Sequence, residues 1–202
     1  AHPAAGLVVN GDLMHAAGGP GFIGVVYSRD GMVYYNQLHP DGSWGNEVLL
    51  SPGSEARLAI DFLGRPHVVL NNLAGQIFYQ MFDGTNWAPH VFIESLNQGG
   101  VGSCSKPDIA VDAAGGVHVT YSDSHGTNDD IKNNDIMYAF KTDGDFTRQL
   151  IFTGYRSYSS SGTWDANYYD YGSYIEVTDA GDYYIMAYRK YIYAWYGGQD
   201  KS

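Results

Sequence analysis

Aromatic and polar side chains gather in residues 153–172, a combination typical of sugar recognition. Tyr and Trp rings stack on the apolar C–H faces of sugars, while amides and carboxylates bond the hydroxyl groups. We therefore predict ligand-binding roles for Tyr155, Tyr158, Trp164, Tyr168 and Tyr169. The alternative is that this Tyr-rich segment folds over the domain as a lid or plug.

A second segment, residues 122–134, is rich in oxygen-bearing side chains. Asp123, Asp129, Asp130 and the adjacent Asp135 could contribute to a Ca²⁺ site, because this ion takes six to eight oxygen ligands. The segment lacks the Glu that closes an EF-hand loop. Ca²⁺ is therefore one interpretation, and a solvated acidic hairpin loop is the other.

These segments lie between repeated elements. Four stretches combine a glycine-containing turn with an alternating strand, and in the last three the turn opens with Asp: residues 18–27, 61–70, 112–121 and 179–188. Each follows a short apolar strand and precedes a strand that ends on tyrosine. In the first three units an Asp-Gly turn with a nearby aromatic then leads to a fourth strand, so each unit is predicted to be a four-stranded meander.

The predicted fold is all-β: one β-propeller domain over residues 1–202, built from four four-stranded antiparallel blades. The predicted blades are residues 11–50, 56–93, 107–152 and 173–202, the last completed by residues 5–9. This N-terminal segment resembles the fourth strands of the other units. Closing the ring with it would remove exposed sheet edges.

The pattern Asp-x-x-Gly-x-x-His-Val-x-Tyr, followed by Ile-x-Tyr and Asp-Gly-x-Trp, resembles the BNR/Asp-box repeats of sialidase-like propellers. It is also similar to the repeats of secreted polysaccharide lyases and lectins. The repeats depart from a full Asp-box, which carries Ser/Thr-x-Asp-x-Gly-x-x-Trp. Only six arginines are present and the expected arginine segment is missing, so the sequence argues against sialidase activity.

The resemblance to lyase-type propellers implies a second function. In those enzymes a His and a Tyr act as base and acid on a uronate sugar, and a cation neutralises its carboxylate. His125 with Tyr121 or Tyr188, and Arg189, are the residues that could supply this set here. Proton abstraction would require the base within hydrogen-bond reach of the substrate.

Meander topology gathers the long connections at one end of the domain. The segments 95–106, 122–134 and 153–172 all follow second or fourth strands, and long loops concentrate function. Arg29, Asn71, Asp123 and Arg189 follow the four second strands and are predicted to emerge on this long-loop face, with Arg29 and Asn71 as ligand-binding residues. The alternative is that all four are ordinary exposed turn residues.

Two histidines occupy the same register in successive units. His67 and His118 each lie six residues after the Asp of the repeat. Their recurrence favours a packing histidine that is hydrogen-bonded between units. Cys104, the only cysteine, is predicted to be an inert thiol because no histidine is paired with it in the pattern.

Composition limits the partners. The net charge is −11, from 22 acidic and 11 basic residues, and no basic run offsets it, which argues against nucleic acid. No apolar run is long enough to span a bilayer. The first five residues suit a mature terminus after export, so we expect a secreted or cell-surface protein, although a trimmed chain would look the same.

Three functions follow. The first is a non-catalytic glycan-binding module whose ligand, a carbohydrate or polysaccharide, lies on the long-loop face. The second is a polysaccharide lyase, and the third is a structural adhesin or homo-oligomerisation module. Whether the protein is an enzyme is left open by the sequence.

Overall fold

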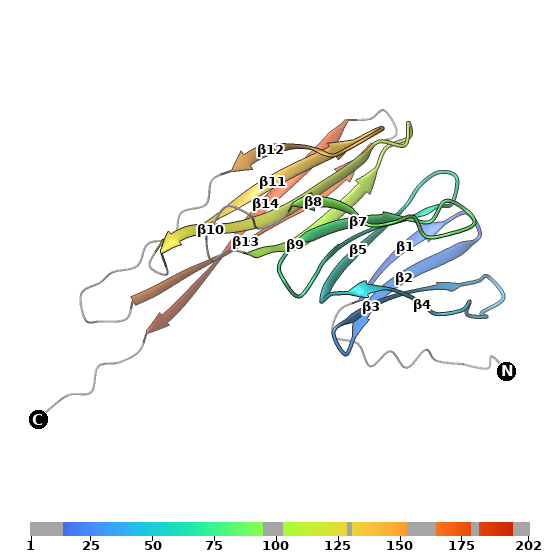
Figure 1. Cartoon of the computed structure of the whole chain (residues 1–202), viewed down its shortest axis with the longest axis horizontal. Coiled ribbons are helices and arrows are strands. Elements are labelled where there is room, and N and C mark those ends of the chain that lie inside the picture. Colours follow the sequence, from blue (N-terminus) through green and yellow to red (C-terminus); the bar gives the residue numbers. More distant parts are fainter. Residues whose placement is uncertain (1–13, 95–102, 129–130, 153–164, 179–181, 196–202) are drawn as a thin grey trace, which may run out of the picture.

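The computed structural model describes residues 14–94, 103–128, 131–152, 165–178 and 182–195 (Figure 1). All the regular elements of these residues are strands, paired antiparallel, and among the described residues there is no helix that could cross a membrane. The first sheet contains β1 (Met14–Gly19), β2 (Phe22–Arg29), β3 (Met32–Leu38) and β4 (Val48–Pro52). The second contains β5 (Glu55–Ile60), β6 (Pro66–Asn71), β7 (Ile77–Met81) and β8 (Val91–Glu94).

The third sheet contains β9 (Ser103–Val111), β10 (Val117–Asn128), β11 (Ile131–Lys141) and β12 (Thr147–Phe152). The fourth has only β13 (Asp165–Val177) and β14 (Tyr183–Trp195). The first three sheets are meanders in chain order, as the repeats predicted. The pairing of third and fourth strands shifts register at the same place in each: after Val33, Ile77 and Ile136.

The sheets stack in succession. β5 contacts β1 and β9, and β13 contacts β9 and β10. In Figure 1 the first sheet lies at one end of the described array and the third and fourth sheets lie towards the other, so no closed ring is shown. Residues 5–9, the predicted closing strand, lie outside the described residues. The coarse prediction of an all-β, propeller-like array is confirmed, and the closure is untested.

Three predictions about the later units are wrong. The last unit was expected to have separate second and third strands, but β14 runs unbroken through both. Residues 122–134 were expected to be a loop, but β10 and β11 continue through most of them, with Ser124 opposite Asn134 and His125 opposite Asn133. Adjacent strands offer continuous hydrogen-bond partners, and these outweigh the polarity of the side chains.

The Tyr-rich segment is also partly strand. Residues 165–172, predicted as loop, belong to β13 and pair with β14. Tyrosine favours extended backbone because its ring packs well on a pleated sheet, which explains the difference. Tyr168 lies opposite Ile192 and Tyr169 opposite Tyr191.

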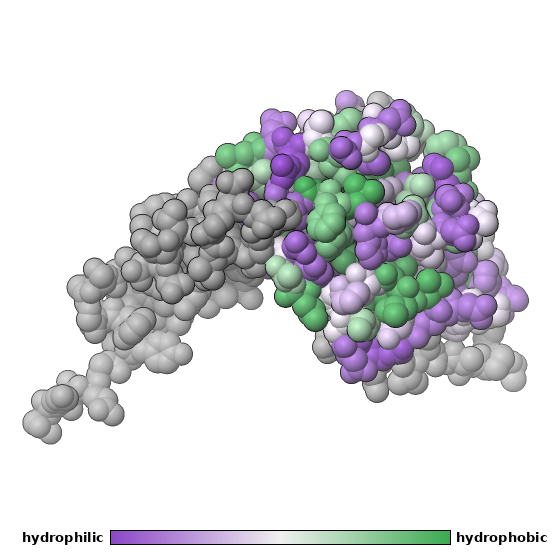
Figure 2. All heavy atoms as spheres, in the orientation of Figure 1, coloured by the Kyte–Doolittle hydropathy of each residue, from purple (hydrophilic) through white to green (hydrophobic). Residues whose placement is uncertain are grey.

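The core lies between successive sheets. Val68 and Leu70 of β6 pack towards the first sheet with Val26 and Leu58, while Val69 belongs to the cluster shared with the third sheet. β6 is therefore buried on both faces. The outer strands β4, β8 and β12 expose apolar side chains instead, including Leu49, Phe92 and Leu150. Figure 2 shows hydrophobic patches interspersed with hydrophilic residues on this side of the described surface.

Candidate functional site

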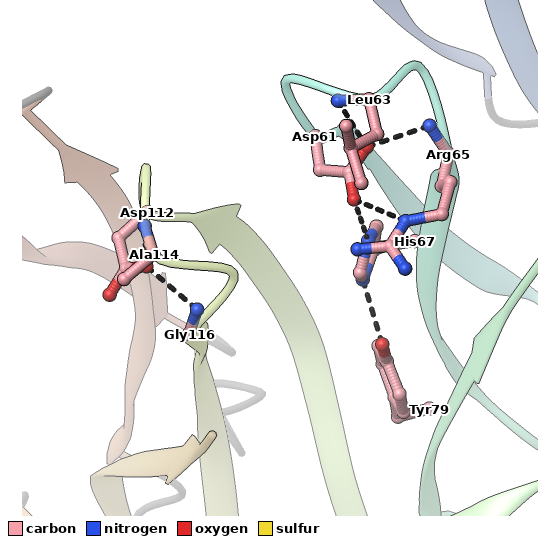
Figure 3. Close-up of polar contacts among 8 residues, drawn as sticks. All are labelled: Asp61, Leu63, Arg65, His67, Tyr79, Asp112, Ala114 and Gly116. Carbon is pink, nitrogen blue, oxygen red and sulfur yellow. Dashed lines mark hydrogen bonds and ion pairs between the residues drawn. The ribbon is translucent and has the colours of Figure 1, made fainter. Parts of the chain in front are cut away.

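The Asp of the repeat forms a tight turn that fixes its carboxylate. Asp61 Oδ1 accepts hydrogen bonds from the backbone N–H groups of Leu63 (3.0 Å) and Arg65 (2.8 Å), as Figure 3 shows. Gly64 completes the turn with φ of 80°, a left-handed conformation that glycine adopts without strain. The second carboxylate oxygen, Oδ2, is thereby directed at the following strand.

That oxygen begins a hydrogen-bonded triad in the second sheet: Asp61, His67 and Tyr79. His67 Nε2 lies 3.3 Å from Asp61 Oδ2, and His67 Nδ1 lies 2.7 Å from the Tyr79 hydroxyl oxygen (Figure 3). Burial lowers the pKa of His67. Burial opposes ionisation of Asp61, but bonds from Arg65 and His67 lower its pKa on balance. An ionised Asp61 accepts from Nε2–H, so Nδ1 accepts from the Tyr79 hydroxyl.

A third-sheet triad repeats this arrangement with Asp112, His118 and Tyr138. His118 Nε2 lies 3.1 Å from Asp112 Oδ2, and Nδ1 lies 2.8 Å from the Tyr138 hydroxyl. Hydrogen bonds from His118 and from backbone N–H groups outweigh the effect of burial and lower the pKa of Asp112. Burial, with the nearby Tyr183 and Asp112, raises the pKa of Tyr138 to about 12. Both bonds join residues within one sheet, so the expected hydrogen bonding between units is wrong.

The two triads differ in what surrounds them. In the second-sheet triad, Arg65 Nε lies 2.6 Å from Asp61 Oδ2, and the edge of the Phe146 ring packs on Tyr79 with centroids 5.4 Å apart. The position of Arg65 is taken by Gly116 in the third sheet. A Cβ at Gly116 would lie 2.4 Å from Asp112 Oδ2 and 3.0 Å from Phe140, so this glycine permits a close approach.

The third-sheet triad opens into a cleft of about 420 Å³ between the third and fourth sheets. We call it the third–fourth cleft; its lining residues are Asp112, His118, Tyr138, Phe140, Thr147, Arg148, Gln149 and Tyr183. Tyr183, from β14, stacks on Tyr138 with centroids 5.1 Å apart and an interplanar angle of 12°. Tyr138 also lies nearly parallel to Phe140, so the cleft is lined with aromatic rings.

Polar groups surround these rings. In the tautomer whose Nε2–H donates to an ionised Asp112, His118 Nδ1 accepts the only hydroxyl hydrogen of Tyr138, whose oxygen then offers a bound molecule only an acceptor. Arg148 pairs with Glu94, which also accepts a hydrogen bond from Tyr121. Because the Arg148 side chain is 46% exposed, its remaining N–H groups can donate to a ligand. The cleft thus offers aromatic surface, a fixed acceptor and a cationic donor.

Of the residues predicted to be catalytic, only Tyr121 has a side chain that the structure describes. Tyr121 is fully buried, its hydroxyl donates to Glu94 at 3.1 Å, and burial raises its pKa. His125 lies in β10, and Tyr188 and Arg189 lie in β14, but their side chains are outside the described residues. Their catalytic roles remain a prediction.

The predicted ligand-binding residues are similarly divided. Tyr155, Tyr158 and Trp164 lie outside the described residues, as do the side chains of Tyr168 and Tyr169. Arg29 is half-buried at the end of β2; it forms an ion pair with Glu47 at 2.8 Å and lies over the Tyr34 ring at 4.4 Å. Asn71 is buried, and its amide donates to the Cys104 carbonyl at 2.9 Å. This bond joins the second sheet to the third.

The predicted metal ligands are described only in part. Asp123 of β10 and Asp135 of β11 lie opposite each other, whereas Asp129 and Asp130 are outside the described residues. Among the residues that the structure describes, no group of three or more His, Cys, Asp or Glu side chains is placed to hold a metal ion. Burial raises the pKa of the Cys104 thiol, as expected of an inert cysteine.

The sequence analysis missed the third–fourth cleft, although its signal was present. The shared register of the two histidines was recognised, but it was not combined with the preceding Asp and the later Tyr. The substitution of Gly116 for Arg65 was the further clue that one of the two triads lacks its covering arginine. The cleft lies beside the short turns of the third sheet, residues 112–116 and 141–146, rather than beside the long connections.

No protein-family model matches the chain, and neither does any curated protein in sequence. No family model therefore supports the resemblance to BNR/Asp-box repeats. The chain is similar in structure to a fucose lectin from Kordia zhangzhouensis, solved in complex with methyl-fucoside. The identity is 14%, the TM-score is 0.44, and the similarity covers 69% of this chain and 99% of that chain. The chain's own strands define an all-β protein of stacked meander sheets.

Proposed function

We propose that this protein binds glycans and that a sugar occupies the third–fourth cleft. The observation that carries the proposal is the set of nearly parallel Tyr138, Phe140 and Tyr183 rings beside fixed polar groups. Such rings present flat apolar surface for the C–H face of a pyranose. Few, well-placed polar groups around an apolar surface are the usual composition of a small-molecule site.

The hydrogen-bonding groups suit a sugar. A hydroxyl both donates and accepts, so it can donate to Tyr138 Oη while a neighbouring sugar oxygen accepts from Arg148. Tyr183 is 49% exposed, which leaves ring surface available for stacking. Bonds to ionised groups contribute more than neutral ones, so Arg148 and Asp112 are expected to set the orientation of the ligand.

We further propose that the protein acts outside the cell, as a secreted or surface-displayed module. The proposal rests on the proposed glycan ligand, and the single buried cysteine is compatible with either compartment. Fractionation of the source cells tests this: the protein is expected in the medium or on the surface. Recovery solely from the cell interior would contradict it.

The binding experiment is a glycan array followed by calorimetry with the sugars that bind, with methyl-fucoside included among the probes. Tyr183→Ala is expected to weaken binding about tenfold or more, since stacking contributes on the order of 1 kcal/mol beyond the area buried. The matched control is Tyr184→Ala. Its ring is 64% exposed, and strand alternation places it on the other face of β14. Equal affinities for the two variants would place the sugar elsewhere.

A lyase-type reaction is a second candidate because His118, Tyr138 and Arg148 line one cleft. Tyr138 would pass its proton to His118 and take up the proton next to a uronate carboxylate. As the carbon–carbon double bond forms and the glycosidic bond breaks, Tyr138 would give that proton to the leaving glycosidic oxygen, and His118 would return its proton to Tyr138. Arg148 would neutralise the carboxylate. Ultraviolet absorbance of uronate polymers incubated with the protein is the test. Absorbance that rises with wild type but not with Tyr138→Phe supports a lyase, and unchanged absorbance with retained binding supports a lectin.

A further inference from the structure

A second cleft lies between the first and second sheets. Its volume is about 150 Å³, and we call it the first–second cleft. Its lining residues are Tyr35, Gln37, Gly45, Asn46, Val48, Phe82 and Trp87. Trp87, which follows the Asp-Gly turn of the second unit, packs edge-on against Tyr35 of the first unit with ring centroids 5.1 Å apart.

The two clefts occupy equivalent positions in the repeat. Tyr35 pairs with Val48 across β3 and β4, as Tyr138 pairs with Gln149 across β11 and β12. Two residues further on, Gln37 takes the position of Phe140, and Asn46 takes that of Thr147. Four lining positions therefore coincide, and in both clefts an aromatic residue of the following sheet packs on the tyrosine.

The intervening interface shares the aromatic contact but is filled differently. Between the second and third sheets, Phe146 packs edge-on against Tyr79 as Trp87 does against Tyr35. Met81, at the position of Gln37, packs there with Val91 against the core cluster. Apolar side chains thus take the equivalent space there.

The hydrogen-bonding direction of the tyrosine is reversed in the first–second cleft. Gly24 takes the position of His67 and His118, and a Cβ there would lie 2.9 Å from Leu58. Tyr35 therefore has no histidine to receive its proton; instead its oxygen accepts from Gln37 Nε2 at 2.8 Å. Its hydroxyl hydrogen has no acceptor assigned among the described residues, so it can donate to a ligand. The cleft adds the amides of Gln37 and Asn46 and carries no charged lining residue.

We infer that the first–second cleft is a second glycan subsite, which takes a single neutral sugar residue. This inference rests on the proposed function of the third–fourth cleft. The small volume suits about one ring, because pockets that bury drug-sized ligands measure roughly 300–1,000 Å³. The uncharged lining favours a neutral sugar over a uronate or sialate, whose carboxylate would be desolvated without a cation. Two sites in one chain would raise the avidity for branched or repeated glycans.

The test follows the indole N–H resonance of Trp87 by NMR during titration with methyl glycosides of fucose, galactose, mannose and glucose. The resonance is assigned with Trp87→Phe. We expect one of these sugars to shift it in wild type and equally in Tyr183→Ala, which impairs only the other cleft. Gln37→Ala and Asn46→Ala are expected to weaken the Trp87-detected affinity about tenfold each, the loss of one good hydrogen bond.

The two proposals fail differently. If calorimetry detects binding that Tyr183→Ala weakens while the Trp87 resonance stays still at saturation, the second subsite is wrong and the third–fourth cleft stands. If Trp87 shifts but Tyr183→Ala changes no affinity, the site of the proposed function is wrong and the first–second cleft stands. If no glycan binds, both are wrong. Thermal unfolding of each variant confirms that a lost signal is not lost folding.

Discussion

The second-sheet and third-sheet triads have the same residues and nearly the same hydrogen bonds, yet their surroundings differ. Arg65 and Phe146 cover the second-sheet triad, whereas the third-sheet triad borders a cleft. The comparison teaches that the triad is first a structural device of the repeat. It joins a turn to two strands, and only the removal of its cover makes its tyrosine available to a ligand.

The largest effect is expected for His67→Ala. His67 is 2% exposed, and its loss would leave the buried Tyr79 hydroxyl without its partner, whereas Asp61 keeps its bonds from Leu63 and Arg65. The unpaired hydroxyl, together with the cavity, should lower the free energy of unfolding by about 3 kcal/mol. Urea denaturation measures the loss. If His67→Ala lowered the free energy of unfolding less than His118→Ala does, the second-sheet triad would not be the more important one for stability.

The substitution Gly116→Ala tests why the third-sheet triad is not covered as the second-sheet triad is. Gly116→Ala is expected to destabilise the protein by about 2 kcal/mol, because the added Cβ would clash with Asp112 Oδ2 and Phe140. It should also weaken sugar binding by displacing the triad. Ala114→Gly, in the same turn, is the control, since it removes a methyl group and creates no clash. Denaturation and calorimetry of both variants give the result; an undisturbed Gly116→Ala protein would refute the close-approach argument.

His118→Ala should separate binding from stability. His118 is itself buried (3% exposed), so its loss leaves a cavity, but water from the cleft can reach Asp112 and Tyr138, and we expect a loss of stability of about 2 kcal/mol, smaller than that of His67→Ala. Tyr138 would no longer be held as an acceptor, and sugar affinity should fall about tenfold. Calorimetry beside denaturation measures both. A stability loss as large as that of His67→Ala, with unchanged affinity, would make the two triads equivalent.

The smallest effect is a pH dependence from the closed triad. Burial holds the pKa of His67 below its usual value of 6.5, so the unfolded chain binds a proton in a range where the folded protein does not. The contribution to stability is full above pH 6.5 and is lost as the pH falls towards the pKa of the folded protein. Urea midpoints between about pH 8 and pH 5 should show this slope, and His67→Gln should flatten it. An unchanged slope in that variant would assign it to other groups.

Much of the strand layout could be predicted because it depends on local signals. The Asp and Gly of each turn, the alternating strands and the Asp-Gly hairpins recur at short range, and three meanders follow from them. The prediction failed where a strand is longer than its local sequence indicates, because it pairs with another strand. Residues 122–134 and 165–172 have loop-like composition or length, but their partner strands supply backbone hydrogen bonds that a local pattern does not contain.

The sequence by itself determined the repeat: the Asp that caps its turn, the histidine six residues later, the tyrosine on the next strand and the acidic, aromatic-rich composition. Only the tertiary structure decided which triad is covered and which is open. That outcome depends on the neighbouring sheet, because Phe146 comes from the third sheet to cover Tyr79 while Tyr183 comes from the fourth to stack on Tyr138. Contacts between distant segments determine solvent access, and the same motif therefore has two environments in one chain.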